Sequence, residues 1–85
     1  MSFKLSIIAP SGKIFEDTVD SLALPGIEGA FEVYSNHMPL ISSLKAGRVR
    51  VRQADREIAY KITSGVLEVD PKHNVTLLAD EAIVA

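Results

Sequence analysis

The chain has 85 residues, of which 47% are hydrophobic and 24% charged, so it has apolar material for one hydrophobic core, and we expect neither a second domain nor intrinsic disorder. Its formal net charge of -2 gives no reason to expect nucleic acid as a partner, because that binding depends on clustered Lys and Arg side chains. The absence of cysteine excludes disulfides and thiolate metal sites and indicates a reducing compartment.

The first part of the chain has the pattern of short strands. Apolar residues alternate with polar ones over 3–7, which predicts a strand with one buried face that ends by Pro10. This amino-terminal run is too short for a signal peptide or a membrane span, so we expect any membrane contact to be indirect. Two further strands are predicted over 13–15 and 19–24, separated by the acidic pair at 16–17.

The segment 24–40 joins two glycines, exposed carboxylates and a His-Met-Pro turn to strand-like apolar runs. Pro25 and Pro39 each lack the N–H that a strand ladder uses, so we expect this segment to interrupt and re-aim strands rather than extend them. Short strands are predicted over 30–34 and 40–44. Because the segment carries no obvious reactive group, it is interpreted as a contact surface.

The clearest alternation in the chain lies over 47–53, where the valines point inward and three arginines share the opposite face. A two-residue turn at 54–55 would return the chain antiparallel over 57–63 and place Arg48 opposite Lys61. This like-charge pair is unfavourable. Either the loop is therefore longer than two residues, or an acidic partner elsewhere compensates the charge.

The last strands are predicted over 65–69 and 75–79, with a turn between them. The only late helical candidate is 80–85, which has a possible Asp cap but is too short to stand without packing. The expected fold class is therefore all-β, a flattened sandwich or barrel of about eight to ten short strands.

The search for catalytic chemistry finds no convergent set. Ser64 lacks the Gly-x-Ser-x-Gly elbow of a nucleophile, and His37 and His73 are the candidate bases. The two histidines have no metal-ligand spacing, and no phosphate-binding glycine motif is present. We therefore expect no catalytic residues, no metal site and no cofactor.

Several polar residues can be interpreted in two ways from the sequence. Glu28 and Glu32 are either solvated loop carboxylates or contact residues. His37 is either a turn histidine that bonds local backbone or a docking residue beside Met38, whose flexible thioether offers adaptable apolar surface. The arginine row over 48–52 is typical of a solvated strand face, and it lacks the interleaved aromatics of a nucleic-acid platform.

A series of short blocks stands in a specific order and at specific spacings along the chain: Ala9 to Gly12 with Phe15, Val19-Asp20-Ser21, Leu24-Pro25-Gly26 with Gly29 and Phe31, His37 with Pro39-Leu40, Leu44-Lys45 with Gly47-Arg48-Val49-Arg50, Ser64-Gly65 with Leu67-Glu68-Val69, and Asn74 to Asp80 with Ala82. On these blocks, over residues 3–82, the chain resembles the epsilon subunit of F-type ATP synthase, in its amino-terminal β-sandwich domain. The family usually has Pro-Gly at 35–36, but Asn36 suits positive φ and can keep that turn. Glu32, Ala46 and Val66 also depart from the family pattern.

The resemblance implies a noncatalytic subunit of the rotating central stalk, which links the gamma subunit to the c-ring and couples proton flow to ATP synthesis. Such a subunit is peripheral on the cytoplasmic face of the membrane, or on the equivalent face of another energy-transducing membrane. The family normally adds a carboxy-terminal helical hairpin that the chain lacks, so we do not expect the inhibition of ATP hydrolysis or the ATP binding attached to that hairpin. The alternative is a free-standing β-sandwich adaptor with another protein partner.

The resemblance also implies two sets of contact residues. The loops expected to face the c-ring contain Gly26, Glu28, Gly29, Ala30, Phe31, Glu32, His37 and Met38. The residues expected to face the gamma subunit are Ala9, Pro10, Leu40, Ile41 and Leu44.

Overall fold

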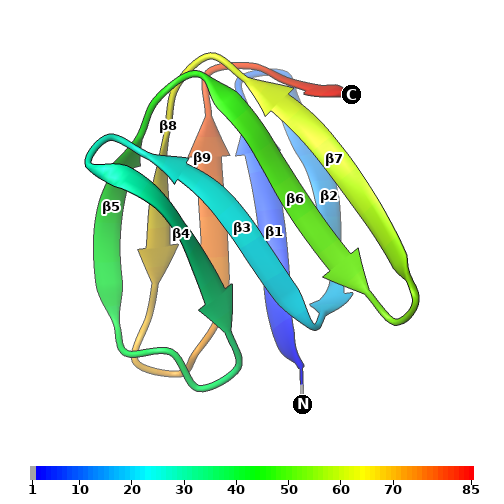
Figure 1. The fold of residues 1–85 in the computed structure, drawn as a ribbon, viewed down its shortest axis with the longest axis vertical. Coiled ribbons are helices and arrows are strands. Elements are labelled where there is room, and N and C mark those ends of the chain that lie inside the picture. The colour runs from blue at the N-terminus through cyan, green and yellow to red at the C-terminus, as the bar shows by residue number, and fades with distance from the viewer. Residues whose placement is uncertain (1) are drawn as a thin grey trace.

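A computed structural model of the chain describes residues 2–85. Within these residues ten strands form one sheet, and there is no helix (Figure 1). The strands are β1 (Phe3–Ala9), β2 (Gly12–Val19), β3 (Ser21–Gly26), β4 (Gly29–Tyr34), β5 (Leu40–Leu44), β6 (Gly47–Gln53), β7 (Arg56–Ile62), β8 (Gly65–Val69), β9 (Val75–Ala79) and β10 (Ala82–Val84).

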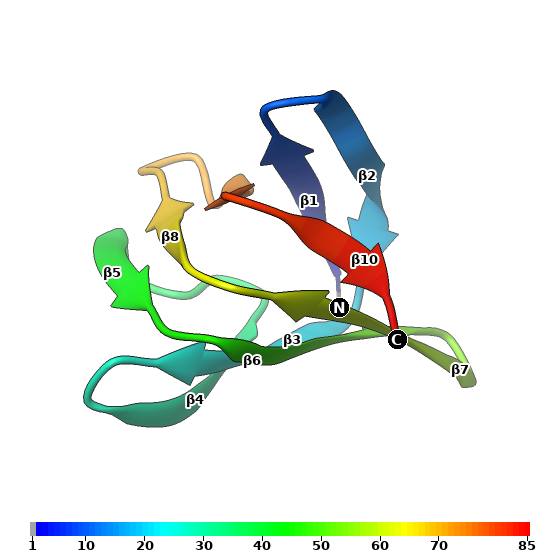
Figure 2. The same ribbon diagram turned by 90° about the horizontal axis from the view of Figure 1, so that it is seen from above.

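The sheet folds over on itself into two layers (Figure 2). Its strand order is β10-β7-β6-β3-β5-β8-β9-β1-β2, and β4 pairs with β3 outside this path. One layer contains β4, β3, β6 and β7, the other contains β8, β9, β1 and β2, and β5 leads from one to the other. The predicted all-β sandwich is confirmed.

The core lies between the layers and is built by alternation along the strands. In β1, Phe3, Leu5 and Ile7 are buried, whereas the residues between them face outward. Phe15 lies in β2, at one end of the strand order, and Tyr60 lies in β7, next to the other end; their rings meet edge to face across the layers, with centroids 6.3 Å apart. Each fully buried Leu, Val or Ile stabilises the fold by about 1.5–3 kcal/mol relative to exposure.

The acidic pair Glu16 and Asp17 does not separate two strands, so that prediction was wrong. Both residues lie inside the single strand β2. They are tolerated because this part of β2 faces solvent, where the Glu16 carboxylate pairs with Lys13 Nζ at 2.9 Å and Lys4 Nζ at 3.6 Å. These two ammonium groups also hold the pKa of the Glu16 carboxyl below its usual range, with Lys13 contributing most.

The expected interruption at Pro25 is also absent, because β3 runs through this residue to Gly26. The ladder between β3 and β6 covers only 21–23, and the next pairing on this edge of β3 joins Gly26 to Leu44 of β5. Pro25 therefore lies where β3 changes neighbours, and its missing N–H removes no bond from the β6 ladder. Its carbonyl oxygen accepts the N–H of Lys45 at 2.9 Å.

The hairpin β6–β7 has the predicted register. A two-residue turn joins the strands, and Arg48 lies opposite Lys61 while Arg52 lies opposite Glu57. The longer loop that would have avoided the like-charge pair is therefore excluded. The late helical candidate forms β10, which pairs with β7 through 82–84.

The turn of this hairpin gives a stability prediction. Ala54 has φ of 57°, a left-handed conformation that costs a residue with a Cβ about 1–2 kcal/mol, and its N–H is held by Asp20 Oδ2 at 2.8 Å. We expect Ala54→Gly to raise the free energy of unfolding by about 0.5–1 kcal/mol in urea titrations, because glycine relieves this strain. The control is Ala46→Gly, at a position without positive φ, which should be neutral or destabilising. Equal effects of the two substitutions would contradict the strain argument.

Candidate interaction surfaces

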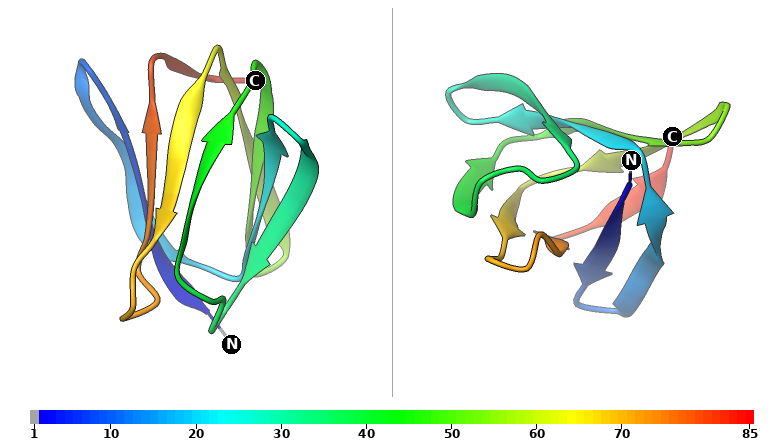
Figure 3. Two further views of the ribbon diagram at one scale, coloured as in Figure 1. Left: turned by 90° about the vertical axis from the view of Figure 1, so that its left-hand side faces the viewer. Right: turned by 90° about the horizontal axis from the view of Figure 1, so that it is seen from below.

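An apolar stripe crosses the outer face of β5, β8, β9 and β1, which faces the viewer in the left view of Figure 3. It consists of Ile41, Val66, Leu78 and Ile8. Val66 lies directly opposite Leu78, and Leu78 lies beside Ile8 in the parallel pair β9–β1. Ile41 and Leu78 are 75% and 49% exposed. Ile41 lies opposite Glu68 and diagonally from Val66, so it stands at the margin of this group. Exposed apolar groups of this kind are candidates for protein contact.

The stripe includes one of the residues expected to face the gamma subunit, Ile41. Pro10 is exposed at the turn between β1 and β2, and Leu40 packs partly against the core. Ala9 and Leu44 are buried, so their side chains are not available to a partner in this structure. Alternation explains this result, since neighbouring residues in a strand point to opposite faces.

The hairpin β3–β4 presents a narrow tip made by Ile27 and Glu28, both exposed. A Cβ placed on Gly26 would lie 2.6 Å from the carbonyl oxygen of Gly29 and 2.8 Å from the ring of Phe31. Only glycine therefore fits at this position, and the ring of Phe31 closes over the base of the tip. Of the residues expected to face the c-ring, Gly26 and Phe31 shape this hairpin. The exposed members are Glu28, Gly29, Ala30 and Glu32.

The other loop expected to face the c-ring contains His37 and Met38, the latter 77% exposed. His37 Nδ1 lies 3.0 Å from the carbonyl oxygen of Met38, so this histidine does bond local backbone. Asn36 has φ of 62°, which confirms that it keeps the positive-φ turn before His37. The structure also brings together two histidines distant in sequence, since His73 Nδ1 lies 3.2 Å from the carbonyl oxygen of His37.

Asp70 fixes the loop that carries His73. Its Oδ1 accepts the backbone N–H groups of Lys72 at 2.9 Å and Asn74 at 3.0 Å. The Asn74 N–H in particular holds the pKa of the Asp70 carboxyl below its usual range. A carboxyl with a depressed folded-state pKa contributes stability above its unfolded pKa of about 3.9, and that contribution is lost as the pH falls through the folded-state value.

We therefore expect the loop 70–74 to loosen below pH 4 before the sandwich unfolds. The amide NMR signals of Lys72 and Asn74 should shift on acidification with a midpoint below about 3.9. Asp70→Asn, which cannot titrate, should abolish this transition. A midpoint at or above 3.9 in the unsubstituted chain would contradict the assignment.

The hairpin tip and the His37–Met38 loop lie at opposite ends of β4 (Figure 1). A strand of six residues spans about 20 Å, so these two groups do not form one compact site. β4 pairs only with β3 among residues 2–85 and leaves its other edge free. A single partner can contact both groups only by lying along β4.

The sequence analysis missed several exposed apolar residues, among them Ile27, Val66 and Leu78. The sequence does contain a signal for Val66 and Leu78. In the pairs Val66-Leu67 and Leu77-Leu78, consecutive apolar residues occupy a strand, and one of each pair must face outward. Ile27 is an apolar residue in a turn flanked by glycines, where no core is available to it.

Two kinds of feature are absent from residues 2–85. Residues 2–85 bring together no group of three or more His, Asp or Glu side chains that could hold a metal ion. The same residues contain no helix that is long and apolar enough to cross a membrane.

Comparison with known proteins gives a family match. The family described as ATP synthase, Delta/Epsilon chain, beta-sandwich domain, matches residues 2–85. The ATP synthase epsilon chain 1 of Thiobacillus denitrificans is 42% identical over 98% of this chain and 60% of its own length. The ATP synthase epsilon chain of Chlorobium limicola is 35% identical over 93% of this chain and 91% of its own length. The chain thus spans less than two thirds of the Thiobacillus relative but nearly all of the Chlorobium one.

A solved structure shows the same fold. A chain of the Euglena gracilis mitochondrial ATP synthase, in a structure of OSCP, F1 and c-ring, superposes with a TM-score of 0.92 at 20% identity. The match covers 98% of this chain and 53% of that chain.

Proposed function

Because the chain belongs to the family of ATP synthase delta/epsilon chains, whose β-sandwich domain it matches over residues 2–85, we propose that it is a noncatalytic central-stalk subunit of an F-type ATP synthase. In this role the sandwich links the gamma subunit to the c-ring and helps to couple proton flow to ATP synthesis. The proposal rests on the family match, and the exposed surfaces are used to propose where each partner docks.

The gamma subunit is proposed to dock on the apolar stripe. Val66 and Leu78 are direct cross-strand neighbours, and Ile41 lies diagonally from Val66 across the β5–β8 ladder. All three belong to strands, so a partner can bury them without ordering a loop. Pro10 and Leu40 lie outside the stripe and are proposed as its margin. The buried Ala9 and Leu44 support the same strands from the core side.

The c-ring is proposed to contact the hairpin tip and the free edge of β4. Glu28 is exposed at the tip, and Glu32 lies farther along β4, where its carboxylate accepts a hydrogen bond from the Tyr34 hydroxyl. This bond raises the pKa of the Tyr34 phenol and orients the carboxylate. Both carboxylates can pair with basic residues of the ring. His37 and Met38 join this interface if the ring lies along the whole of β4.

The proposed role is mechanical and requires no active site in this chain. A sandwich whose core side chains fill the space between its layers transmits strain, because packed interiors have few voids and low compressibility. Torque can therefore pass through the sandwich from one contact surface to the other. Membrane contact is proposed to be indirect, through the c-ring, on the cytoplasmic face or its equivalent.

The test is titration of the purified chain with the gamma subunit of its own synthase, followed by addition of the c-ring. We expect a gamma complex with a Kd of micromolar or below, and recruitment of that complex to the c-ring. Absence of gamma binding at micromolar concentration would contradict the stalk role and favour the adaptor alternative.

A further inference from the structure

The layer that contains β3, β6 and β7 carries positive charge without a partner. Arg48 lies directly opposite Lys61, and Arg50 follows on the same face of β6. The ion pairs formed within residues 2–85 involve none of these three cations. By contrast, Arg52 lies opposite Glu57, with Nη2 3.7 Å from Oε2. Like charges directly opposite each other in a ladder are destabilising, so an acidic group from a partner would stabilise Arg48 and Lys61 by neutralising their charge.

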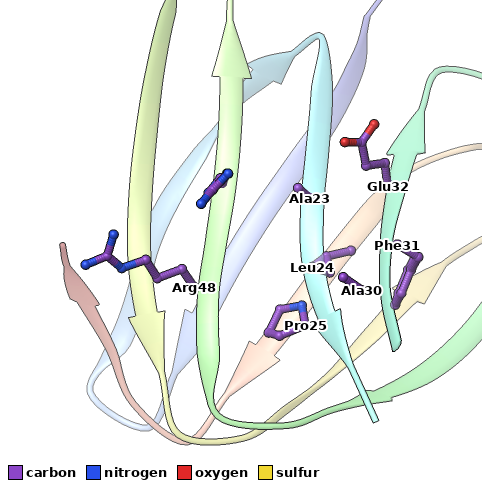
Figure 4. A pocket seen from close by; sticks show the side chains of 8 residues that line it. Ala23, Leu24, Pro25, Ala30, Phe31, Glu32 and Arg48 are labelled. Carbon is purple, nitrogen blue, oxygen red and sulfur yellow. The ribbon is translucent and has the colours of Figure 1, made fainter. Parts of the chain in front are cut away.

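A trough runs along β3 beside these cations (Figure 4). Its floor is made by the small outward side chains of Ser21, Ala23 and Pro25, while the larger residues between them point into the core. Arg48 and Arg50 line the hollow on the β6 side and Glu32 lines it on the β4 side, while Arg52 and Glu57 line its narrower part. Figure 4 shows Glu32 on β4, and it shows the side chain of Arg48 extending away from β3, across β7. A hollow of about 440 Å³ over Ala23 and Pro25 continues into one of about 200 Å³ over Ser21.

The trough has the dimensions of one extended polypeptide. Neighbouring strands lie about 4.8 Å apart, so the walls on β4 and β6 stand about 10 Å from each other across β3. Residues two apart in a strand lie about 6.8 Å apart, which is the spacing between Arg48 and Arg50. An extended segment with acidic residues at alternate positions repeats at this same distance. Each of its carboxylates can therefore pair with one guanidinium in the bidentate geometry that arginine favours, once the side chain of Arg48 turns from β7 toward β3.

We propose that the β3 trough, defined by Ser21, Ala23, Pro25, Arg48, Arg50 and Glu32, binds an extended acidic segment of a protein partner. The carboxylates of this segment pair with Arg48 and Arg50 and relieve the repulsion between Arg48 and Lys61. Phosphate chains of nucleic acid or anionic lipid fit less well, because the Glu32 carboxylate on the facing wall repels a continuous row of phosphates. The trough uses none of the residues of the apolar stripe, so this inference does not depend on the proposed gamma contact.

The test is an NMR titration of the chain with a synthetic decapeptide of alternating Glu and Thr. We expect amide shifts that centre on 21–25 and 48–50, and no such shifts with the matched peptide of alternating Gln and Thr. The double variant Arg48→Gln with Arg50→Gln should weaken binding at least about tenfold, since it removes two charge-assisted contacts. Lysine at both positions should restore part of the affinity. The control, Lys4→Gln with Lys13→Gln, makes the same change in net charge on the other layer and should bind normally.

Thermal melts separate lost binding from lost folding. The midpoint of the Arg48→Gln, Arg50→Gln variant should equal or exceed that of the unsubstituted chain, because the repulsion with Lys61 is gone. A lower midpoint would contradict the premise. The proposal is overturned if the acidic peptide causes no shift in the trough at millimolar concentration, or if the glutamine variant keeps its affinity. Larger shifts with a DNA duplex or phosphatidylglycerol vesicles at equal charge would overturn it in favour of those ligands.

Discussion

Leu77→Ala is expected to lower the free energy of unfolding by about 2–5 kcal/mol, the range for a buried leucine truncated in a packed core. Leu77 is 0% exposed at the centre of β9, where it lies opposite Leu67 of β8 and beside Ile7 of β1. These neighbours belong to ladders on both sides of β9, so they cannot collapse into the space that the side chain leaves. Equilibrium unfolding in urea measures the effect.

The adjacent residue supplies a matched control. Leu78→Ala removes the same atoms from the next position of the same strand, but this side chain is 49% exposed and faces outward. We expect it to cost about 1 kcal/mol or less, because little buried area is lost. Similar losses for the two substitutions would contradict the assignment of inward and outward faces. A domain of this size has a total stability of about 5–15 kcal/mol, so the Leu77 variant should be studied at low temperature.

The double substitution Ile41→Lys with Leu78→Gln is expected to weaken gamma binding at least about a hundredfold, which corresponds to about 2.7 kcal/mol. It places a charge and an amide in the apolar stripe. The gamma subunit would have to bury both groups without hydrogen bonds to them, which is costly. The fold should survive, because Ile41 lies opposite Glu68 in the β5–β8 ladder and a lysine there gains an opposite charge. Calorimetric titration with the gamma subunit measures the loss.

Ile83→Gln is the control for this double variant. Ile83 is 56% exposed, but it lies on β10, at the far end of the sheet order from the strands of the stripe. We expect it to leave gamma affinity within about twofold. If Ile83→Gln weakens binding as strongly as the stripe variant does, the gamma site must be moved toward β10. If neither variant weakens binding, the stripe has no role in it.

Local pattern was sufficient for the parts of the fold that depend on neighbouring residues. The alternation over 47–53 and the two-residue turn at 54–55 determined the register of β6 and β7, down to the pairing of Arg48 with Lys61. Asn36 was predicted to take positive φ because its short polar side chain tolerates that conformation, and it does. The same reasoning failed at Glu16 and Asp17, since a strand face in solvent accepts charges that the interior excludes.

The sequence by itself determined the fold class, the inward residues and the family resemblance, because period two and turn chemistry act within a few residues. Only the tertiary structure decided which strands are neighbours, since the ladders β3–β6, β5–β8 and β1–β9 join segments distant along the chain. These long-range pairings collect the apolar stripe from four strands. They also set two unpaired arginines beside a floor of small residues. No local pattern encodes these arrangements, because they depend on how the whole sheet closes around its core.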